Sequence, residues 1–201
     1  MPFSLAIVAL VLLWTWLLVT RVPNRAVLAV GAAVIALAVW HNLRRGEWGV
    51  TWRALGGASR GAILFTLSGV GLILAAGCAL GTLHDRRDFL GSFGPLVVWG
   101  AGQQWVLQTV LLREAQRAVS RRGGIVVAAA LFGLLHLPNP LLTGVTIAAA
   151  LCWCTIYDRY PNVVPLAVSQ GLGTLALRHA FDPETLGRLR VGYSYLLLGG
   201  P

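Results

Sequence analysis

The seven acidic residues of this chain all lie in or beside short polar breaks between apolar runs. They are Glu47, Asp85, Asp88, Glu114, Asp158, Asp182 and Glu184. Charged side chains are costly at membrane depth, so this placement is typical of a chain whose main solvent is lipid. Composition agrees, because 57% of the 201 residues are hydrophobic and 11% are charged, far from the balance of a water-soluble domain. We therefore predict an all-α fold, a polytopic integral membrane helical bundle with six to eight transmembrane helices.

Apolar runs of membrane-crossing length recur along the chain. A bilayer core about 30 Å thick requires about 20 helical residues. The expected membrane segments are residues 3–20, 26–40, 61–83, 93–120, 124–137, 141–157 and 163–177. In the polar stretch His41–Arg60 tryptophans alternate with arginines, which predicts an interfacial helix. The last apolar patch, Tyr193–Leu198, is too short to span a bilayer alone.

The sixteen basic residues are all arginines, and they give the chain a net charge of +9. They lie in short clusters beside apolar runs, which is typical of topology setting and lipid headgroup contact rather than nucleic-acid binding. We expect membrane lipids as partners, no nucleic acid, and a location in a bacterial inner (plasma) membrane. The larger arginine count in the second and fourth loops favours a cytoplasmic N-terminus. The sequence leaves the oligomeric state open.

Polar side chains within the predicted spans are the candidate functional residues, because burying them in lipid is costly. They are Gln103, Gln104, Gln108, His136, Asn139, Ser169 and Gln170. Gln104 and Gln108 are one helical turn apart and share a face. Phe132 precedes His136 by four residues, which places an aromatic ring one turn from the imidazole. Each group alone fits interhelical hydrogen bonding, but together, on successive helices, they predict one buried polar pocket.

The order of these residues resembles the CPBP family, the CAAX proteases and bacteriocin-processing enzymes also called ABI. Core helices of that family carry E-E-x-x-x-R, then F-x-x-x-H, then H-x-x-x-N. The matching segments here are Gln103-Gln104-Trp-Val-Leu-Gln108, Phe132-Gly-Leu-Leu-His136 and Ser169-Gln-Gly-Leu-Gly173. The resemblance covers about residues 90–177. It implies a membrane-embedded endopeptidase in which the first glutamate activates water, while the histidines and the asparagine shape the site.

Most residues of that mechanism are replaced in this chain. Both glutamates and the arginine are glutamines here, and the third motif begins with Ser169, or with Gln170 if the register shifts by one. A carboxamide cannot act as a base at any relevant pH. Glu114 lies roughly 15 Å along the helix from Gln104, so His136 is the remaining candidate base in the membrane.

We expect a single membrane domain over residues 1–201, because no repeat or linker divides the chain. It would comprise N-terminal helices over 1–88, a CPBP-like core over 89–177 and a C-terminal tail over 178–201. The three cysteines, Cys78, Cys152 and Cys154, lie inside apolar runs, where packing is favoured over metal or disulfide chemistry. One histidine and several amides form a weak ligand set for zinc. We therefore expect no metal and no cofactor.

Three functional hypotheses follow. The first is a divergent CAAX-type intramembrane endopeptidase acting on peptides. Its catalytic residues would be His136 as base with Gln103, Gln104 and Ser169, and its substrate contacts would be Gln108, Phe132, Asn139 and Gln170. The second is a non-proteolytic pseudoprotease of the same fold, whose neutral pocket binds a peptide or a prenyl or other lipid ligand as a chaperone, immunity or assembly factor. The third, a transporter or channel subunit, ranks last because the sequence lacks a repeated pair of interrupted helices.

Overall fold

The computed structural model describes residues 24–84 and 89–198, which form helices and their connections with no β-strand in these two ranges. The predicted segment 3–20 lies outside them. The α-helices are α3 (Asn24–Arg45), α4 (Leu55–Ala79), α5 (Phe89–Trp105), α6 (Arg113–Ala118), α7 (Arg121–Leu134), α8 (Pro140–Arg159), α9 (Val163–Ala180) and α10 (Tyr193–Leu198). Three short elements join them: the 3₁₀ turns η2 (Trp52–Ala54) and η4 (Gly187–Leu189), and the π-helical segment η3 (Val106–Leu112).

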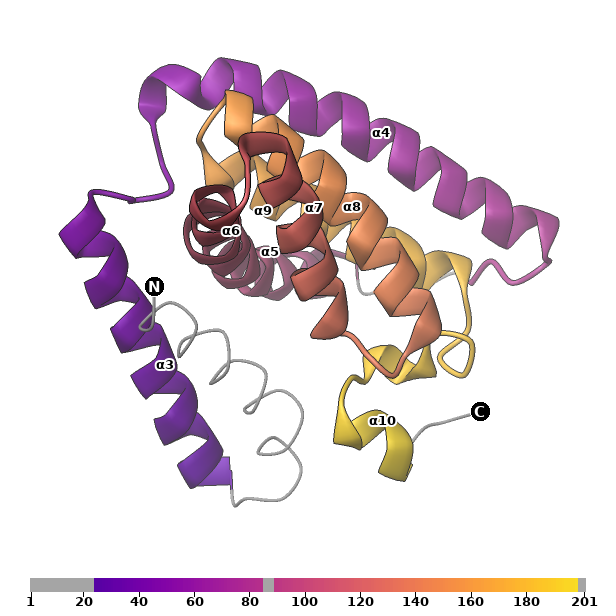
Figure 1. The fold of residues 1–201 in the computed structure, drawn as a ribbon. Helices are drawn as coiled ribbons and strands as arrows, with labels where there is room; N and C mark the ends of the chain where they lie inside the picture. The colour runs from indigo at the N-terminus through magenta and orange to yellow at the C-terminus, as the bar shows by residue number, and fades with distance from the viewer. Residues whose placement is uncertain (1–23, 85–88, 199–201) are drawn as a thin grey trace.

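The bundle is built around α5, η3, α8 and α9, with α4 laid across α8 and α9 and with α3 on the opposite side (Figure 1). α4 approaches α9 closely at Gly77, where an added Cβ would lie 2.6 Å from the Ala180 carbonyl oxygen. α7 and α8 form a hairpin in which Gly133 lies against the Ile147 side chain. Small residues at these positions allow the helix backbones to pack at short distance, as membrane helices do.

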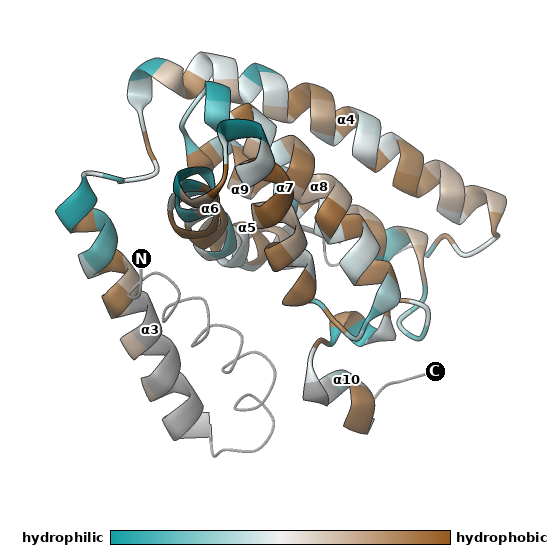
Figure 2. Cartoon of the chain, in the orientation of Figure 1, coloured by the Kyte–Doolittle hydropathy of each residue, from teal (hydrophilic) through white to brown (hydrophobic). Residues whose placement is uncertain are grey.

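Two helices are long and apolar enough to cross a membrane, one formed by η2 and α4 over Trp52–Ala79 and the other α8. They contain most of the predicted segments 61–83 and 141–157. The apolar side chains of α4 face outward, with Leu64, Leu67 and Leu72 between 63% and 73% exposed. Figure 2 shows hydrophobic residues along much of this helix. An outward apolar surface of this kind is typical of a helix that faces lipid or another apolar partner. The full count of six to eight spans stays a prediction.

Local capping chemistry marks the starts of α7, α8 and α9, which lie within three residues of the predicted starts, whereas α4 begins at Leu55, six residues before the predicted segment 61–83. The Ser120 side chain accepts from Gly123 N at 3.0 Å at the start of α7. Asn139 and Asn162 cap α8 and α9 by accepting from Leu142 N and Val164 N at 3.1 and 3.0 Å. Asparagine and serine are favoured there because their oxygens satisfy free N–H groups of the first turn.

The predicted interfacial helix over His41–Arg60 is wrong. α3 continues to Arg45, an irregular segment follows, and α4 starts at Leu55. Gly46 and Gly49 break the helix with φ angles of 68° and 77°, a region that favours glycine. Gly49 also faces Trp105, whose Cδ1 would lie 3.0 Å from an added Cβ. The alternating pattern therefore belongs to a connection that packs on the bundle.

Candidate functional site

Four glutamines on α5, η3 and α9 form a row of hydrogen bonds in the bundle, which we call the amide chain. Gln108 Nε2 donates to Gln104 Oε1 at 3.0 Å, and Gln104 Nε2 donates to Gln170 Oε1 at 2.8 Å. Gln170 Nε2 then donates to Gln103 Oε1. Gln104 and Gln108 are both 0% exposed. The four side chains are uncharged, and each hydrogen bond of the amide chain joins the Nε2 of one glutamine to the Oε1 of another.

The segment η3, which carries Gln108, is buried on all sides. Its residues 107–112 are all buried, with Leu107, Leu111 and Leu112 in the main core and Val110 against Ala38 of α3. Short π-helical insertions occur frequently at functional sites. The segment thus places an amide where neighbouring helices exclude solvent.

One acceptor of the amide chain has no partner. Gln108 Oε1 is buried and accepts no hydrogen bond. The Cys154 thiol of α8 lies against the Gln108 side chain, but a thiol is a weak donor. An amide oxygen in such surroundings can accept one hydrogen bond from a small ligand or a water molecule.

Ser169 belongs to a second row of polar contacts, directed toward α8 and α4. Trp153 Nε1 donates to Ser169 Oγ at 3.0 Å, and Thr66 Oγ1 lies 2.7 Å from the same oxygen. Thr66 Oγ1 also lies 2.6 Å from the Ala62 carbonyl oxygen, which cannot donate. Because Thr66 has one hydroxyl proton, the proton between the two hydroxyls belongs to Ser169 when Thr66 donates to Ala62. The Ser169 hydroxyl then both accepts and donates inside the protein.

His136 lies in the turn after α7, on a different element from the amide chain. Its Nδ1 is 2.8 Å from the Phe132 carbonyl oxygen, and the two rings meet edge to face with centroids 4.9 Å apart. Phe132 itself is 2% exposed and packs in the main core beside Leu107. The F-x-x-x-H spacing therefore produces the expected contact of the two rings, while the polar partner of the imidazole is backbone.

Asn139 joins the start of α8 to the C-terminal tail. Besides capping α8, its Nδ2 donates to the carbonyl oxygens of Leu186 at 2.8 Å and Arg190 at 3.2 Å. The side chain is 1% exposed, and each of its polar atoms has a protein partner. The structure thus gives this predicted substrate contact a set of hydrogen bonds within the fold.

A groove of about 600 Å³ lies between α4 and α9. None of the eight predicted site residues lines it. Its walls are mainly apolar, and two histidines, His84 and His179, stand at one end; the walls include Leu67, Val70, Leu74, Leu172, Leu175 and Ala176. Thr66 lines the groove and contacts Ser169, so the second polar row reaches this surface.

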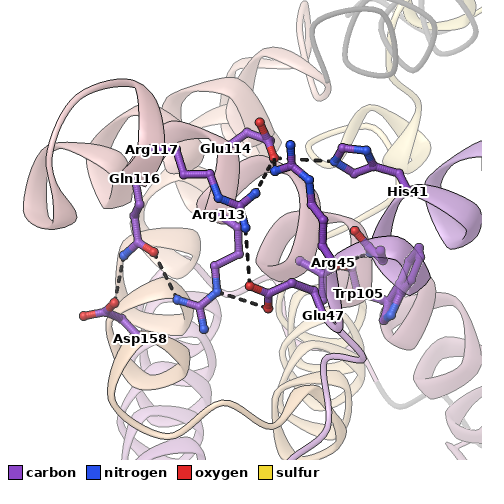
Figure 3. A network of polar contacts seen from close by, with 11 residues as sticks. His41, Arg45, Glu47, Trp105, Arg113, Glu114, Gln116, Arg117 and Asp158 are labelled. Carbon is purple, nitrogen blue, oxygen red and sulfur yellow. Dashed lines mark hydrogen bonds and ion pairs between the residues drawn. The ribbon is translucent and has the colours of Figure 1, made fainter. Parts of the chain in front are cut away.

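A network of charged side chains, which sequence reasoning missed, lies at one end of the bundle (Figure 3). Arg45 and Arg117 both donate to Glu114, the latter at 2.5 Å, and His41 Nε2 lies 3.5 Å from the same carboxylate. We call this network the charged end. Its members are His41, Arg45, Glu47, Arg113, Glu114, Gln116, Arg117, Arg121 and Asp158.

The charged end fastens α3 and the following connection to η3 and α6. Glu47 Oε2 lies 3.5 Å from Arg113 Nε, and the buried Asn42 Nδ2 donates to Thr109 Oγ1 at 2.6 Å. The sequence feature that points to this network is the placement of the acids at polar breaks, next to arginine clusters. The individual contacts join residues 67 and 69 positions apart in the chain, which no local pattern predicts.

Among the described residues, no three histidine, cysteine, aspartate or glutamate side chains gather as a metal site would require. The carboxylates of the charged end are engaged with arginines, and the buried row contains amides, which are weak ligands for zinc. The described residues thus supply hydrogen-bonding groups rather than a ligand set.

Comparison with known proteins gives a match in the central part of the chain. A family model described as Type II CAAX prenyl endopeptidase Rce1-like matches residues 86–175. No curated protein and no solved structure matches the chain. The matched segment contains all eight predicted site residues, and the family is membrane-embedded, in agreement with the two apolar helices. The match and the motif order within it support membership of the CPBP family, and with it a CAAX-protease-like membrane protein.

Proposed function

We propose that this chain is a non-proteolytic member of the CPBP family that binds an apolar lipid or prenyl ligand within a bacterial inner membrane. The observation that carries the proposal is the amide chain. The positions that correspond to the glutamate pair and the arginine of the family are glutamines, and these glutamines hydrogen-bond to one another and to Gln170.

Hydrolysis needs a base that takes a proton from water, and the amide chain supplies none. A carboxamide does not accept a proton at any relevant pH. Glu47, Glu114 and Asp158 are engaged with arginines at the charged end, and Glu114 lies roughly 15 Å along the helix from Gln104. Loss of a positioned base typically lowers the rate by about 10²–10⁴.

The two other polar residues of the motifs are also engaged within the protein. The Ser169 hydroxyl lies between Trp153 Nε1 and Thr66 Oγ1. His136 Nδ1 faces the Phe132 carbonyl oxygen. These contacts favour a structural role for Ser169 and His136, in which they hold the helices together. Of the two activities, hydrolysis and ligand binding, the fold therefore supports binding better.

The groove between α4 and α9 supports a hydrocarbon ligand over a peptide. Its volume of about 600 Å³ falls within the range of small-molecule sites. A peptide would bring backbone N–H and C=O groups that leucine and valine walls cannot satisfy, and each such group costs free energy. A prenyl or acyl chain brings none, and it would enter laterally because α4 is exposed along its length.

The first experiment tests hydrolysis. We would incubate the protein, reconstituted in lipid vesicles, with a farnesylated peptide and follow products by mass spectrometry, beside the His136→Ala variant. We expect no cleavage product from either protein. Cleavage by the wild-type protein that His136→Ala abolishes would overturn the proposal and establish the endopeptidase.

The second experiment tests binding in the same preparation. A photoreactive farnesyl probe should label the wild-type protein at residues of the groove, and Leu74→Trp should reduce the labelling by filling it. Leu72→Trp is the matched control, because Leu72 lies on the same helix, is 73% exposed and does not line the groove. Equal labelling of the two tryptophan variants would refute binding in this groove.

A further inference from the structure

Arginines are unevenly divided between the two ends of the bundle. At the charged end, residues 44–60, 113–122 and 158–163 lie together, joined by Thr51 N to the Pro161 oxygen at 2.9 Å and Val163 N to the Gly49 oxygen at 2.8 Å. These ranges contain nine arginines and three acids, Glu47, Glu114 and Asp158. Figure 2 shows hydrophilic residues gathered here, at the end of α3, in α6 and at the start of α7.

The described residues of the opposite end include fewer arginines. Its described segments meet through His84 N to the His179 oxygen at 2.8 Å and Gly192 N to the Leu137 oxygen at 2.7 Å. Residues 178–195 contain three arginines and two acids, and Arg25 in the first turn of α3 adds a fourth arginine. Opposite ends of one membrane bundle therefore differ strongly in positive charge.

Five arginines beside the charged end, within the ranges 44–60, 113–122 and 158–163, have no carboxylate partner among the described residues. Arg45, Arg113, Arg117 and Arg121 are paired with the three acids. The exposed remainder is Arg44, Arg53, Arg60, Arg122 and Arg159, which we call the arginine surface. Arginine presents several N–H donors in a planar fork that matches phosphate oxygens. Unpaired guanidinium groups at a membrane edge are thus suited to phosphate headgroups.

Aromatic side chains stand among these arginines. Trp48 and Trp52 are 66% and 74% exposed. The Arg44 guanidinium lies 4.2 Å from the Trp40 ring centroid, and that of Arg159 lies 5.9 Å from Tyr160. Tryptophan and tyrosine are enriched at membrane–water interfaces, where the ring meets the headgroup level. Their position beside the arginine surface places that surface at headgroup depth.

We propose that the arginine surface binds anionic phospholipid headgroups and sets the charged end on the cytoplasmic side of the membrane. Three independent observations agree: the excess of arginine at one end, the lack of carboxylate partners for five of them, and the exposed tryptophans between them. Anionic lipids attract each basic residue near the surface by about 1 kcal/mol, which corresponds to a factor of roughly five in binding. The His136 turn and the C-terminal tail then face the opposite side.

The lipid test uses the full chain in vesicles of phosphatidylcholine containing increasing fractions of phosphatidylglycerol. Association of spin-labelled phosphatidylglycerol is compared with that of spin-labelled phosphatidylcholine. The test variant combines Arg44→Gln, Arg53→Gln, Arg60→Gln, Arg122→Gln and Arg159→Gln. The control combines Arg178→Gln, Arg188→Gln and Arg190→Gln at the other end. We expect the preference for the anionic lipid to fall at least about five-fold in the test variant and little in the control.

Equal preference in wild type and test variant would overturn the proposal, and so would loss of preference in the control alone. Absence of any preference in the wild type, with binding of an acidic peptide at the same arginines, would assign the surface to a protein partner instead. Circular dichroism of each variant separates these results from misfolding.

A second measurement tests the orientation. In a background with Cys78, Cys152 and Cys154 replaced by alanine, single cysteines are introduced by Arg53→Cys and Arg188→Cys. A membrane-impermeant maleimide applied to intact bacterial cells should label the second variant and spare the first until the cells are opened. Labelling of Arg53→Cys in intact cells would place the charged end outside and refute the orientation.

Discussion

The charged end and the amide chain both include residues of the continuous helix formed by α5, η3 and α6, yet they satisfy polar groups in opposite ways. Gln104 and Glu114 are separated by roughly 15 Å at the helical rise. The Glu114 side chain is 16% exposed and is surrounded by arginines, whereas Gln104 is 0% exposed and meets other amides. Where water is near, the chain uses ion pairs, and where it is excluded, the chain uses neutral hydrogen bonds.

The difference has a physical cause. Removing an ionised group from water costs several kcal/mol even after relaxation, and only a good counter-ion recovers it. At the charged end each carboxylate keeps partial contact with solvent and has at least one arginine. The amide chain contains no arginine, because all four of its members are glutamines. A neutral glutamine row is therefore the stable way to keep polar atoms at this depth.

The largest expected effect comes from placing a charge in the amide chain. Gln104→Glu would lose the N–H donated to Gln170 and would bury a carboxylate without a cation. We expect the free energy of unfolding in mixed micelles to fall by about 3–5 kcal/mol at alkaline pH. Since the penalty applies to the ionised form, the loss should shrink as the pH falls and the carboxyl group is protonated.

The same substitution at the charged end is the matched control. Gln116 donates to Asp158 Oδ1 at 2.8 Å and accepts from Arg113 Nη1 at 3.1 Å. In Gln116→Glu the new carboxylate would repel Asp158 but would attract the Arg113 guanidinium more strongly. The position is half-buried. We expect a change below about 1 kcal/mol. Similar losses at both positions would show that the two regions do not differ in their tolerance of charge.

A smaller effect is expected from removing charge at the charged end. Glu114→Gln leaves Arg45 and Arg117 without their shared carboxylate, and hydrogen bonds to charged groups contribute about 1.5–3 kcal/mol each when well formed. Because both arginines are partly exposed, we expect a total loss of about 2 kcal/mol. The loss should decrease in high salt, because ions screen the wild-type attraction.

Glu184→Gln provides the comparison for that measurement. Glu184 also pairs with an arginine, Arg188, at 3.7 Å, but its side chain is 71% exposed. Exposed pairs of this kind contribute little, so no measurable loss is expected. If both variants lost the same stability, burial would not be the property that distinguishes the charged end.

Periodic features of the sequence predicted much of this arrangement. The apolar runs predicted α8 and α9 to within a few residues, because proline and asparagine mark where each helix begins. The one-turn spacing of Gln104 and Gln108 predicted their shared face, and the F-x-x-x-H spacing predicted the contact of Phe132 with His136. These features depend on helical geometry alone.

Contacts between distant segments could not be predicted in this way. The π-helical segment Val106–Leu112 has no sequence signature apart from its apolar character. Thr66 and Trp153 became partners of Ser169 only through the packing of α4 and α8 on α9. The alternation of tryptophan and arginine over 41–60 predicts an interfacial helix, but the helix ends at Arg45 because Gly46 and Gly49 adopt positive φ angles.

Ser169 provides the smallest test, because it is a polar side chain that both a catalytic and a structural role would explain. In Ser169→Ala the buried Trp153 Nε1 loses its acceptor, and an unsatisfied donor costs about 1–2 kcal/mol. Ser68→Ala is the control, since the exposed Ser68 hydroxyl donates at 2.9 Å to Leu64 in its own helix.

A double-mutant cycle with Trp153→Phe separates the catalytic role of Ser169 from the structural role. If Ser169 has a structural role, the double variant loses less stability than the sum of the losses in the two single variants. Strict additivity, with altered ligand labelling in Ser169→Ala alone, would instead assign Ser169 to the binding site and extend that site from the groove to the neutral interior.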